Sequence, residues 1–323
     1  MSLVQVDYKS KMTKLTTQSQ VIIFLGLIIT VAIFSYLSPH FFSLRNFMNI
    51  VRQMSMIAIV AFGMTFVIIA GEIDLSVGSI IGITGMVAAI SMKNGLNPII
   101  VIAGALVLGA LIGLLNGLMV VKVKITAFLA TLVTMSVLRG LSLASTPGAA
   151  PVTINSPLFV EITTTNIGSI PIVLIYLITI LVILHFILNK TVFGRHIYAT
   201  GGGANAAALA GVNIQFIKMM VFVISGLLAS FSGLVLAGRL SAGVPDSGTG
   251  WELDAIAAAV LGGTKFSGGQ GSVIGTLGGA LIMGVVSNGL TLLGMTYAYQ
   301  LIIKGIIIAL AVILDIWVRR TDS

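Results

Sequence analysis

Long apolar runs recur through almost the whole chain and leave few polar residues between them. A bilayer span needs about 20 mostly apolar residues, and the sequence offers ten candidate spans, of which the eighth is short. They are residues 20–38, 50–70, 75–92, 98–121, 126–145, 169–189, 216–238, 252–266, 272–293 and 298–318. Charged residues make up only 8% of the chain, against about 25% in soluble domains. The sequence therefore predicts an all-α polytopic membrane protein with about ten transmembrane helices.

The positions of Lys and Arg predict which loops face the cytoplasm, where basic residues are retained. With the N-terminus inside, ten spans place most basic residues in cytoplasmic loops: Lys122 and Lys124, the segment 190–218, Lys265, and Arg319 with Arg320. The exceptions are Arg45, Lys93 and Arg239, which fall near the outer face. The net charge of +8 reflects this bias, and we expect no nucleic-acid partner.

These boundaries predict three parts of the chain. A cytoplasmic N-terminal segment covers 1–19, a transmembrane domain covers 20–318, and a cytoplasmic tail covers 319–323, so both termini face the cytoplasm. The first apolar run is longer than the 7–15-residue core of a signal peptide and lacks a small-residue cleavage site, so we expect it to be retained.

Matching words in the two halves indicate an internal repeat. The word GALI occurs at 109–112 and 279–282, NGL at 116–118 and 288–290, and an acid–apolar–acid triplet at 72–74 and 252–254. These matches relate spans 2–5 to spans 7–10. Because five is an odd number of spans, the copies would be inverted, as in many transporters. Chance recurrence of short Gly, Ala and Leu words is the alternative.

Glycines four residues apart predict close helix packing. One set is Gly109, Gly113 and Gly117, and the other is Gly271, Gly275 and Gly279. Small residues along one helical stripe let backbones approach where lipid provides no hydrophobic drive. We expect packing inside the chain, with an oligomer seam as the alternative.

A few polar residues at membrane depth are candidates for the translocation pathway, since such residues are costly and by default suggest function. They are Glu72, Asp74, Ser76, Asn116, Glu252, Asp254 and Asn288. Helix capping by Asp74 or Ser76, and attraction of Glu252 and Asp254 to a helix start, are structural explanations that stay open.

Enzyme and cofactor signatures are missing or incomplete. The chain has no cysteine and three scattered histidines, so no metal site is expected. The sequence GGGANA at 201–206 fits a loose dinucleotide pattern, but no acidic residue lies about twenty residues further on. FSGGQ at 266–270 resembles part of an ATPase, yet the chain has no phosphate-binding loop. We therefore expect a non-catalytic chain without a cofactor.

The segment 191–213 is basic at its start and Ala-rich afterwards. This composition predicts a short helix below the membrane on the cytoplasmic side, whose small side chains would fit a groove on a partner. A plain surface loop is the alternative.

Six stretches carry a resemblance to a known family. They are SPHFFSLRNFMNI (38–50), GMTFVIIAGEIDLSVGSIIGITG (63–85), ITAFLATLVTMSVLRG (125–140), FGRHIYATGG (193–202), LSAGVPDSGTGWELDAIAAAVLGGTKFSGGQGSVIGTLGGAL (240–281) and SNGLTLLGM (287–295). The chain resembles the permease subunits of bacterial ABC importers for ribose and related monosaccharides.

The resemblance implies a pore-forming dimer in the inner membrane, with a cytoplasmic ABC ATPase and a periplasmic sugar-binding protein as partners. It also makes 190–215 the coupling loop that receives the ATPase stroke. The residues assigned to this contact are Arg195, Gly201, Gly202, Ala204, Asn205, Ala206, Gly211 and Asn213. The family often has Glu-Ala-Ala where this chain has Ala204, Asn205 and Ala206, so the acidic residue of that triplet is missing.

The resulting hypothesis is a homodimeric permease that imports a ribose-like monosaccharide with ATP hydrolysed on another chain. One alternative keeps the architecture and changes the cargo to a furanosyl signal, a nucleoside or a branched-chain amino acid. A second alternative is an ion-coupled secondary transporter with inverted repeats, which would work without an ATPase.

Overall fold

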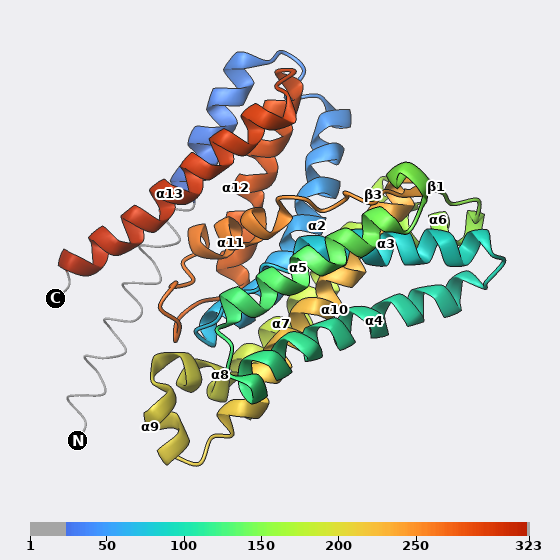
Figure 1. Ribbon diagram of the computed structural model, residues 1–323. Coiled ribbons are helices and arrows are strands. Elements are labelled where there is room, and N and C mark those ends of the chain that lie inside the picture. Colours follow the sequence, from blue (N-terminus) through green and yellow to red (C-terminus); the bar gives the residue numbers. More distant parts are fainter. Residues whose placement is uncertain (1–23, 322–323) are drawn as a thin grey trace.

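The computed structural model describes residues 24–321, and it is built almost entirely of helices (Figure 1). The expected N-terminal segment 1–19 and the start of the first span lie outside the described residues. A helix at Phe24–Leu37 is followed in order by α2 Leu44–Ile69, α3 Val77–Lys93, α4 Pro98–Leu118, a π-helix Met119–Val123, α5 Ala127–Ala144, a 3₁₀ turn Pro147–Ala149, β1 Val152–Thr153, α6 Pro157–Thr164, β2 Asn166–Ile167, β3 Ile170–Pro171, α7 Ile172–Lys190, α8 Val192–Gly202, α9 Ala204–Leu209, α10 Ile214–Leu240, β4 Ala242–Gly243, α11 Trp251–Leu261, α12 Val273–Leu292 and α13 Tyr297–Thr321.

Every candidate span contains a helix, but the helices differ in length. Among the described residues, six helical segments are long and apolar enough to cross a membrane: α2, α4 with its π-helix, α5, α7, α10 and α12. At about 1.5 Å per residue, the 11 residues of α11 cover only about 16 Å, roughly half of a 30 Å hydrocarbon layer. The eighth candidate span is therefore too short to cross alone. The count of ten spans stays a prediction.

Local sequence explains where several helices begin. The side chain of Ser43 accepts a hydrogen bond from the N–H of Asn46 at the start of α2, and Ser272 does the same for Gly275 at the start of α12. Such caps satisfy N–H groups that have no partner within the helix. At α4, Asn97 caps Ile99, and Pro98 occupies the first helical position, where its missing N–H costs nothing.

Helices α2 and α10 form the centre of the molecule, and nearly all side chains of the inner half of α2 are buried. Helix α10 packs on α2, α3 and α4, whereas α2 packs on α10, α11 and α12. In a repeat of spans 2–5 and 7–10, α2 corresponds to α10, α3 to α11 and α4 to α12. Each of the two central helices thus packs on the other and on the two helices that follow the other, as such a repeat predicts. The repeat itself stays a prediction.

The predicted glycine stripes serve internal packing. A methyl group at Gly109 would overlap Ser230, one at Gly113 would overlap the carbonyl of Phe222, and one at Gly117 would lie 2.8 Å from the Cα of Met219. All three contacts are with α10. In the second set, Gly275 and Gly279 are equally close to the backbone of Gly262 and Ala258. These glycines allow the close approach of helices that small residues give in membranes.

Loops expected on one side of the membrane lie together in the structure. On the side of α8 and α9, the N–H of Gly269 donates to the carbonyl of Ile69 at 2.8 Å, and Lys122 Nζ lies 3.4 Å from Gln215 Oε1. On the opposite side, near α6, strand β1 pairs antiparallel with β4 and Tyr297 donates to the carbonyl of Thr249 at 3.0 Å. Below, the two faces are called the α8–α9 side and the α6 side.

Candidate translocation site

The two acidic triplets lie at the starts of the short helices α3 and α11. Gly71, at a φ of +84°, ends α2 in a conformation that glycine adopts without strain, and the first triplet follows before α3 begins. The second triplet lies in the first turn of α11, after a loop with Gly248 and Gly250 at φ values of +77° and +81°. The local sequence thus breaks the chain before each triplet.

Asp74 is the centre of a buried polar network. Its Oδ1 accepts hydrogen bonds from the N–H and the hydroxyl of Ser76 at 2.9 and 2.6 Å, and its Oδ2 accepts from Ser225 of α10 at 2.8 Å. Asn116 of α4 donates to the Ser76 hydroxyl at 2.9 Å and accepts from Thr134 of α5 at 2.6 Å. We call these five residues the Asp74 network. It ties α10, α4 and α5 to the segment before α3.

The Asp74 network is buried, and its polar atoms bond to one another. Asp74, Ser76, Asn116 and Ser225 have no exposed surface, and Thr134 is 5% exposed. Ser76 does not cap α3 through its side chain; Asp74 instead accepts the N–H of Ser76. Since the network satisfies its own polar atoms, Asp74, Ser76 and Asn116 join helices without needing a ligand.

Glu72 lies apart from this network, toward the α8–α9 side. It forms an ion pair with Lys218 of α10, and the two side chains are 13% and 26% exposed. The pair joins the segment after α2 to the beginning of α10, just beyond the segment expected to contact the ATPase.

A second group of charged side chains surrounds the start of α11. Lys304 of α13 donates to Asp254 Oδ2 at 2.7 Å, while Asp254 Oδ1 and Glu252 Oε2 are buried acceptor atoms without a hydrogen-bond partner. Arg139 of α5 donates to the carbonyls of Ser247 and Pro245 at 3.0 and 3.4 Å, and its charge acts on Glu252. We call Arg139, Glu252, Asp254 and Lys304 the α11 charge cluster.

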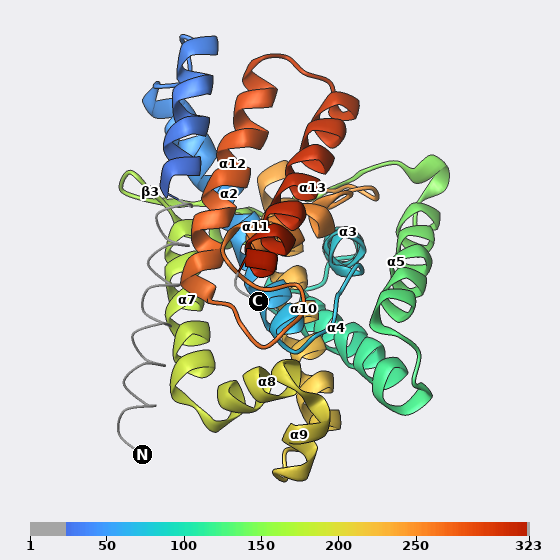
Figure 2. The same ribbon diagram turned by 90° about the vertical axis from the view of Figure 1, so that its left-hand side faces the viewer.

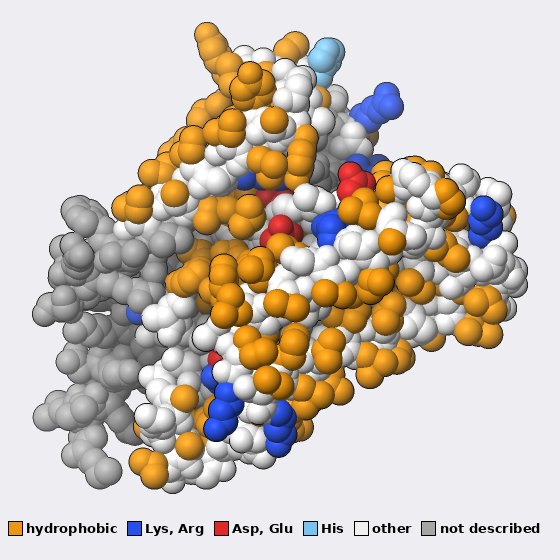
Figure 3. Space-filling view, viewed as in Figure 1, with side chains coloured by type: hydrophobic (Ala, Val, Ile, Leu, Met, Phe, Trp, Pro, Cys, Tyr) orange, Lys and Arg blue, Asp and Glu red, His pale blue; other side chains and the backbone are white. Residues whose placement is uncertain are grey.

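Charged side chains of both signs gather in a hollow on the face drawn in Figure 3. Helix α11 contacts both α13 and α3, and α3 contacts α5; Figure 2 shows α3 between α13 and α5. In the space-filling view, acidic and basic side chains appear together in the hollow between the α12–α13 part and the α5 part (Figure 3). This arrangement offers both donors and acceptors to a ligand that enters from this face.

Three of the expected pathway residues therefore fall in the Asp74 network, two fall in the α11 charge cluster, and two stand apart. One of the latter is Glu72, and the other is Asn288, whose Nδ2 donates to Asn46 at 2.8 Å at the opposite end of α2. Arg139 and Lys304 are not among the pathway residues predicted from the sequence. Both are charged residues inside candidate spans, and that signal could have found them.

The segment expected to contact the ATPase forms two helices instead of one. Thr191 caps α8, which carries Arg195, Gly201 and Gly202, and the chain breaks at Gly203 before α9. Ala204, Asn205 and Ala206 form the first turns of α9, Gly211 has a φ of +86°, and Asn213 caps α10. Leu209 at the end of α9 is 92% exposed.

Close backbone contacts hold α8 against the end of α2 and the loop between α11 and α12. A methyl group at Gly201 would overlap the carbonyl oxygen of Ile69 and lie 2.6 Å from the N of Gly269. Tyr198 donates to the carbonyl of Gly271 at 2.8 Å. Burial raises the pKa of Tyr198 to about 12. Helix α8 thus touches both the end of α2 and the loop between α11 and α12.

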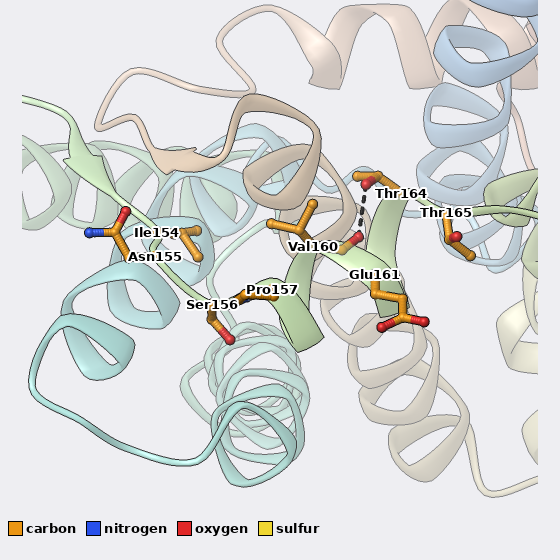
Figure 4. Close-up of a pocket in the computed structure, with 8 residues that line it drawn as sticks. All are labelled: Ile154, Asn155, Ser156, Pro157, Val160, Glu161, Thr164 and Thr165. Carbon is orange, nitrogen blue, oxygen red and sulfur yellow. Dashed lines mark hydrogen bonds between the residues drawn. The ribbon is translucent and has the colours of Figure 1, made fainter.

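Two pockets lie on the α6 side of the molecule. A cavity of about 680 Å³ is lined by Ile154, Asn155, Ser156, Pro157, Val160, Glu161, Thr164 and Thr165 (Figure 4). These residues belong to the α6 region, and the cavity opens broadly at the surface. A second pocket, of about 230 Å³, lies on the same side and includes Arg52 and Arg239.

Comparisons with known proteins give consistent results. Residues 46–312 match the family model described as the permease component of branched-chain amino acid transport systems. The chain is 45% identical over 296 residues to the ribose import permease protein RbsC of Haemophilus influenzae, covering 90% of this chain and 91% of the relative. It is 43% identical over 302 residues to the ribose import permease protein RbsC of Bacillus subtilis, covering 90% and 91%.

A third relative, the L-arabinose ABC transporter permease protein AraH of Azospirillum brasilense, is 37% identical over 300 residues, covering 93% of this chain and 87% of the relative. No solved structure matches the chain. A family match over most of the chain and relatives above 40% identity carry one conclusion: this chain belongs to the family of permease components of branched-chain amino acid transport systems.

Proposed function

We propose that this chain is the membrane-spanning subunit of an ATP-binding-cassette importer in the bacterial inner membrane and that it carries a ribose-like monosaccharide inward. The observation that carries the proposal is the similarity to ribose import permeases, at 43–45% identity over 90% of the chain. Energy would come from ATP hydrolysed on a partner chain.

The polar groups of the chain suit a neutral polyol. Sugar hydroxyls both donate and accept hydrogen bonds, and the α11 charge cluster offers acceptors on Glu252 and Asp254 next to donors on Arg139 and Lys304. We assign the translocation path to this face of the molecule. Glu72, Asp74, Ser76, Asn116 and Asn288 then support the path without touching the sugar.

A branched-chain amino acid is the cargo that the family description suggests instead. It would need a cation for its carboxylate, a carboxylate for its ammonium group and an apolar pocket for its side chain. The charge cluster supplies both signs, so uptake measurements must decide between the two cargoes. The sugar is favoured because the relatives named for ribose and for arabinose cover nearly the whole chain.

The ATPase is proposed to bind the α8–α9 side. The 92% exposed Leu209 and the exposed Asn205 and Ala206 suit a hydrophobic and shape-based contact, since no acid stands at position 204. Arg195, also exposed, can pair with an acidic group of the ATPase. Movement of α8 would reach the end of α2 through Gly201.

Two further partners complete the proposal. A sugar-binding protein is proposed to dock on the α6 side, where Arg52 and Arg239 share a pocket and each lies within electrostatic reach of the other. A second copy of the chain is proposed to pair with it, as the resemblance to dimeric permeases implies. In this orientation both termini face the cytoplasm.

The test is uptake into proteoliposomes that contain the permease with its ATPase and binding protein. We expect ATP-dependent accumulation of radiolabelled ribose and no accumulation of leucine. Uptake of leucine would overturn the sugar assignment. If the permease alone accumulated sugar and an uncoupler abolished this accumulation, the chain would be an ion-coupled transporter.

A further inference from the structure

The α11 charge cluster lies near the middle of the membrane layer. Asp74 is bonded to Ser225, the twelfth of the 27 residues in α10 counted from Ile214, so the start of α3 lies near the mid-height of a helix long enough to span. Glu252 Oε2 lies so close to Gly78, in the first turn of α3, that a methyl group there would overlap it. The start of α11 therefore lies at a similar depth.

The loop before α11 reaches this depth along a glycine face of α3. A methyl group at Gly82 would lie 2.9 Å from the carbonyl oxygen of Ser247, and one at Gly243 would lie 3.0 Å from the Cα of Met86. The loop thus runs back along α3 from its end toward its beginning. A loop can lie within the membrane layer where protein surrounds it.

The first turns of α3 and α11 meet at the α11 charge cluster. The N-terminal end of a helix carries partial positive charge, which explains how the carboxylate of Glu252 is tolerated beside Gly78. In several transporters, the starts of short helices near the membrane midplane point at the substrate. Here two such starts, from the two halves of the chain, lie side by side.

Two acceptor atoms of this cluster are unused. Asp254 is 1% exposed, and its Oδ1 has no partner although its Oδ2 binds Lys304. Glu252 Oε2 is also buried without a partner. A buried acceptor without a donor is costly, and few are retained in native structures. A ligand with hydroxyl groups would supply the missing donors.

We propose that the α11 charge cluster is a polyol-binding site in the translocation path. Glu252 and Asp254 accept hydrogen bonds from sugar hydroxyls, Arg139 donates to a sugar oxygen, and Lys304 orients Asp254. This inference rests on the proposed function and adds to it which residues contact the sugar.

Trp251 provides a direct readout, because it precedes Glu252 and is half-buried. The chain has two tryptophans, so Trp317→Phe leaves Trp251 as the only one. We would titrate the purified full chain with D-ribose and follow Trp251 fluorescence. We expect a saturable change in the Trp317→Phe protein, and at least a tenfold rise in the ribose concentration at half-saturation when Glu252→Gln is added.

Two further variants serve as a control outside the cluster and as a second change within it. Glu161→Gln changes an exposed carboxylate in α6 and should leave the titration unchanged. Arg139→Gln alters the cluster from another helix and should weaken ribose binding even if Glu252→Gln fails to fold. Size-exclusion chromatography checks folding of each variant.

The outcomes separate this inference from the proposed function. Ribose uptake by the wild-type complex together with unchanged titration of folded Glu252→Gln and Arg139→Gln proteins would overturn the binding site alone. Absence of ribose uptake by the wild-type complex would overturn the proposed function. A fluorescence response to sodium chloride but not to choline chloride or ribose would identify a cation site instead of a polyol site.

Discussion

The two acidic triplets share a local pattern and differ in their surroundings. Asp74 accepts three hydrogen bonds from neutral groups, and the network around it leaves none of its carboxylate oxygens without a partner. Asp254 accepts one hydrogen bond from a cation and keeps a free oxygen. Asp74 is enclosed by α4, α5 and α10, whereas Asp254 lies in α11 and is bonded to Lys304 of α13.

This difference separates structural from functional polar groups at membrane depth. A satisfied buried network fixes the positions of helices, because every shift breaks hydrogen bonds that lipid cannot replace. An unsatisfied buried acceptor is costly, and a ligand, a water or an ion can supply its missing donor. The same sequence pattern can therefore serve packing in one half of the chain and binding in the other.

The largest effect is expected from Asp74→Ala. This change leaves the backbone N–H of Ser76 without its acceptor, at a cost of about 1–3 kcal/mol, and adds the loss at Ser225 and the Ser76 hydroxyl. We expect a clear fall in the thermal unfolding midpoint of the detergent-purified protein and less folded protein in the membrane. Fluorescence-detected size-exclusion after heating measures both.

Asp74→Asn is the control for the charge. Its amide oxygen can still accept from Ser76, and the hydroxyl of Ser225 can rotate to accept from its NH₂ group. We expect the unfolding midpoint and ribose uptake of this variant to stay near those of the wild type. Loss of uptake in a stable Asp74→Asn protein would show that the carboxylate acts in transport and would remove the contrast between the triplets.

The second-largest effect is expected from Gly201→Ala, at the contact between α8 and the end of α2. The new methyl group would overlap the carbonyl of Ile69, two residues before Gly71. Backbone atoms move less easily than side chains, so this overpacking costs about 1–3 kcal/mol of the free energy of unfolding. We expect ATP hydrolysis to continue while ribose uptake falls at least fivefold. Gly104→Ala in α4, with no atom within 4 Å of the added methyl, should keep both activities.

A smaller effect is expected from Tyr198→Phe, which removes the hydrogen bond from α8 to Gly271, in the loop after α11. One such bond contributes about 1 kcal/mol. The pKa of Tyr198 is about 12, above the usual value near 10, so the phenol stays protonated. Its hydrogen bond therefore contributes fully to the free energy of unfolding below about pH 10. This contribution would be lost only as pH rises through about 12.

The pH dependence gives the readout for Tyr198. The unfolding midpoint of Tyr198→Phe should lie below that of the wild type by the same amount at every pH from 6 to 9. Tyr36→Phe, at a position that is 91% exposed, should leave the midpoint unchanged. A difference that disappears between pH 6 and 9 would contradict the assigned pKa.

Sequence patterns could predict the helices, because apolar length is a local property, while the roles of the candidate pathway residues and of 190–215 stay predictions. The patterns could not separate Asp74 from Asp254. That distinction depends on Ser225, Asn116 and Thr134 in one case and on Lys304 in the other, which are distant in sequence. The composition of 191–213 predicts one short helix, whereas the structure has two, α8 and α9, on either side of Gly203.

The smallest effect is expected from Glu72→Gln, at the position in the first triplet that corresponds to Glu252. Glu72 pairs with Lys218 in a partly exposed setting, where an ion pair contributes about 0–1 kcal/mol, and Lys218 can reach water when the charge of its partner is removed. We expect less than a twofold change in ribose uptake, measured in parallel with Glu252→Gln, for which we expect a strong loss. If the two substitutions lowered uptake equally, the triplets would act alike in transport. Their different surroundings would then not distinguish a structural triplet from a binding one.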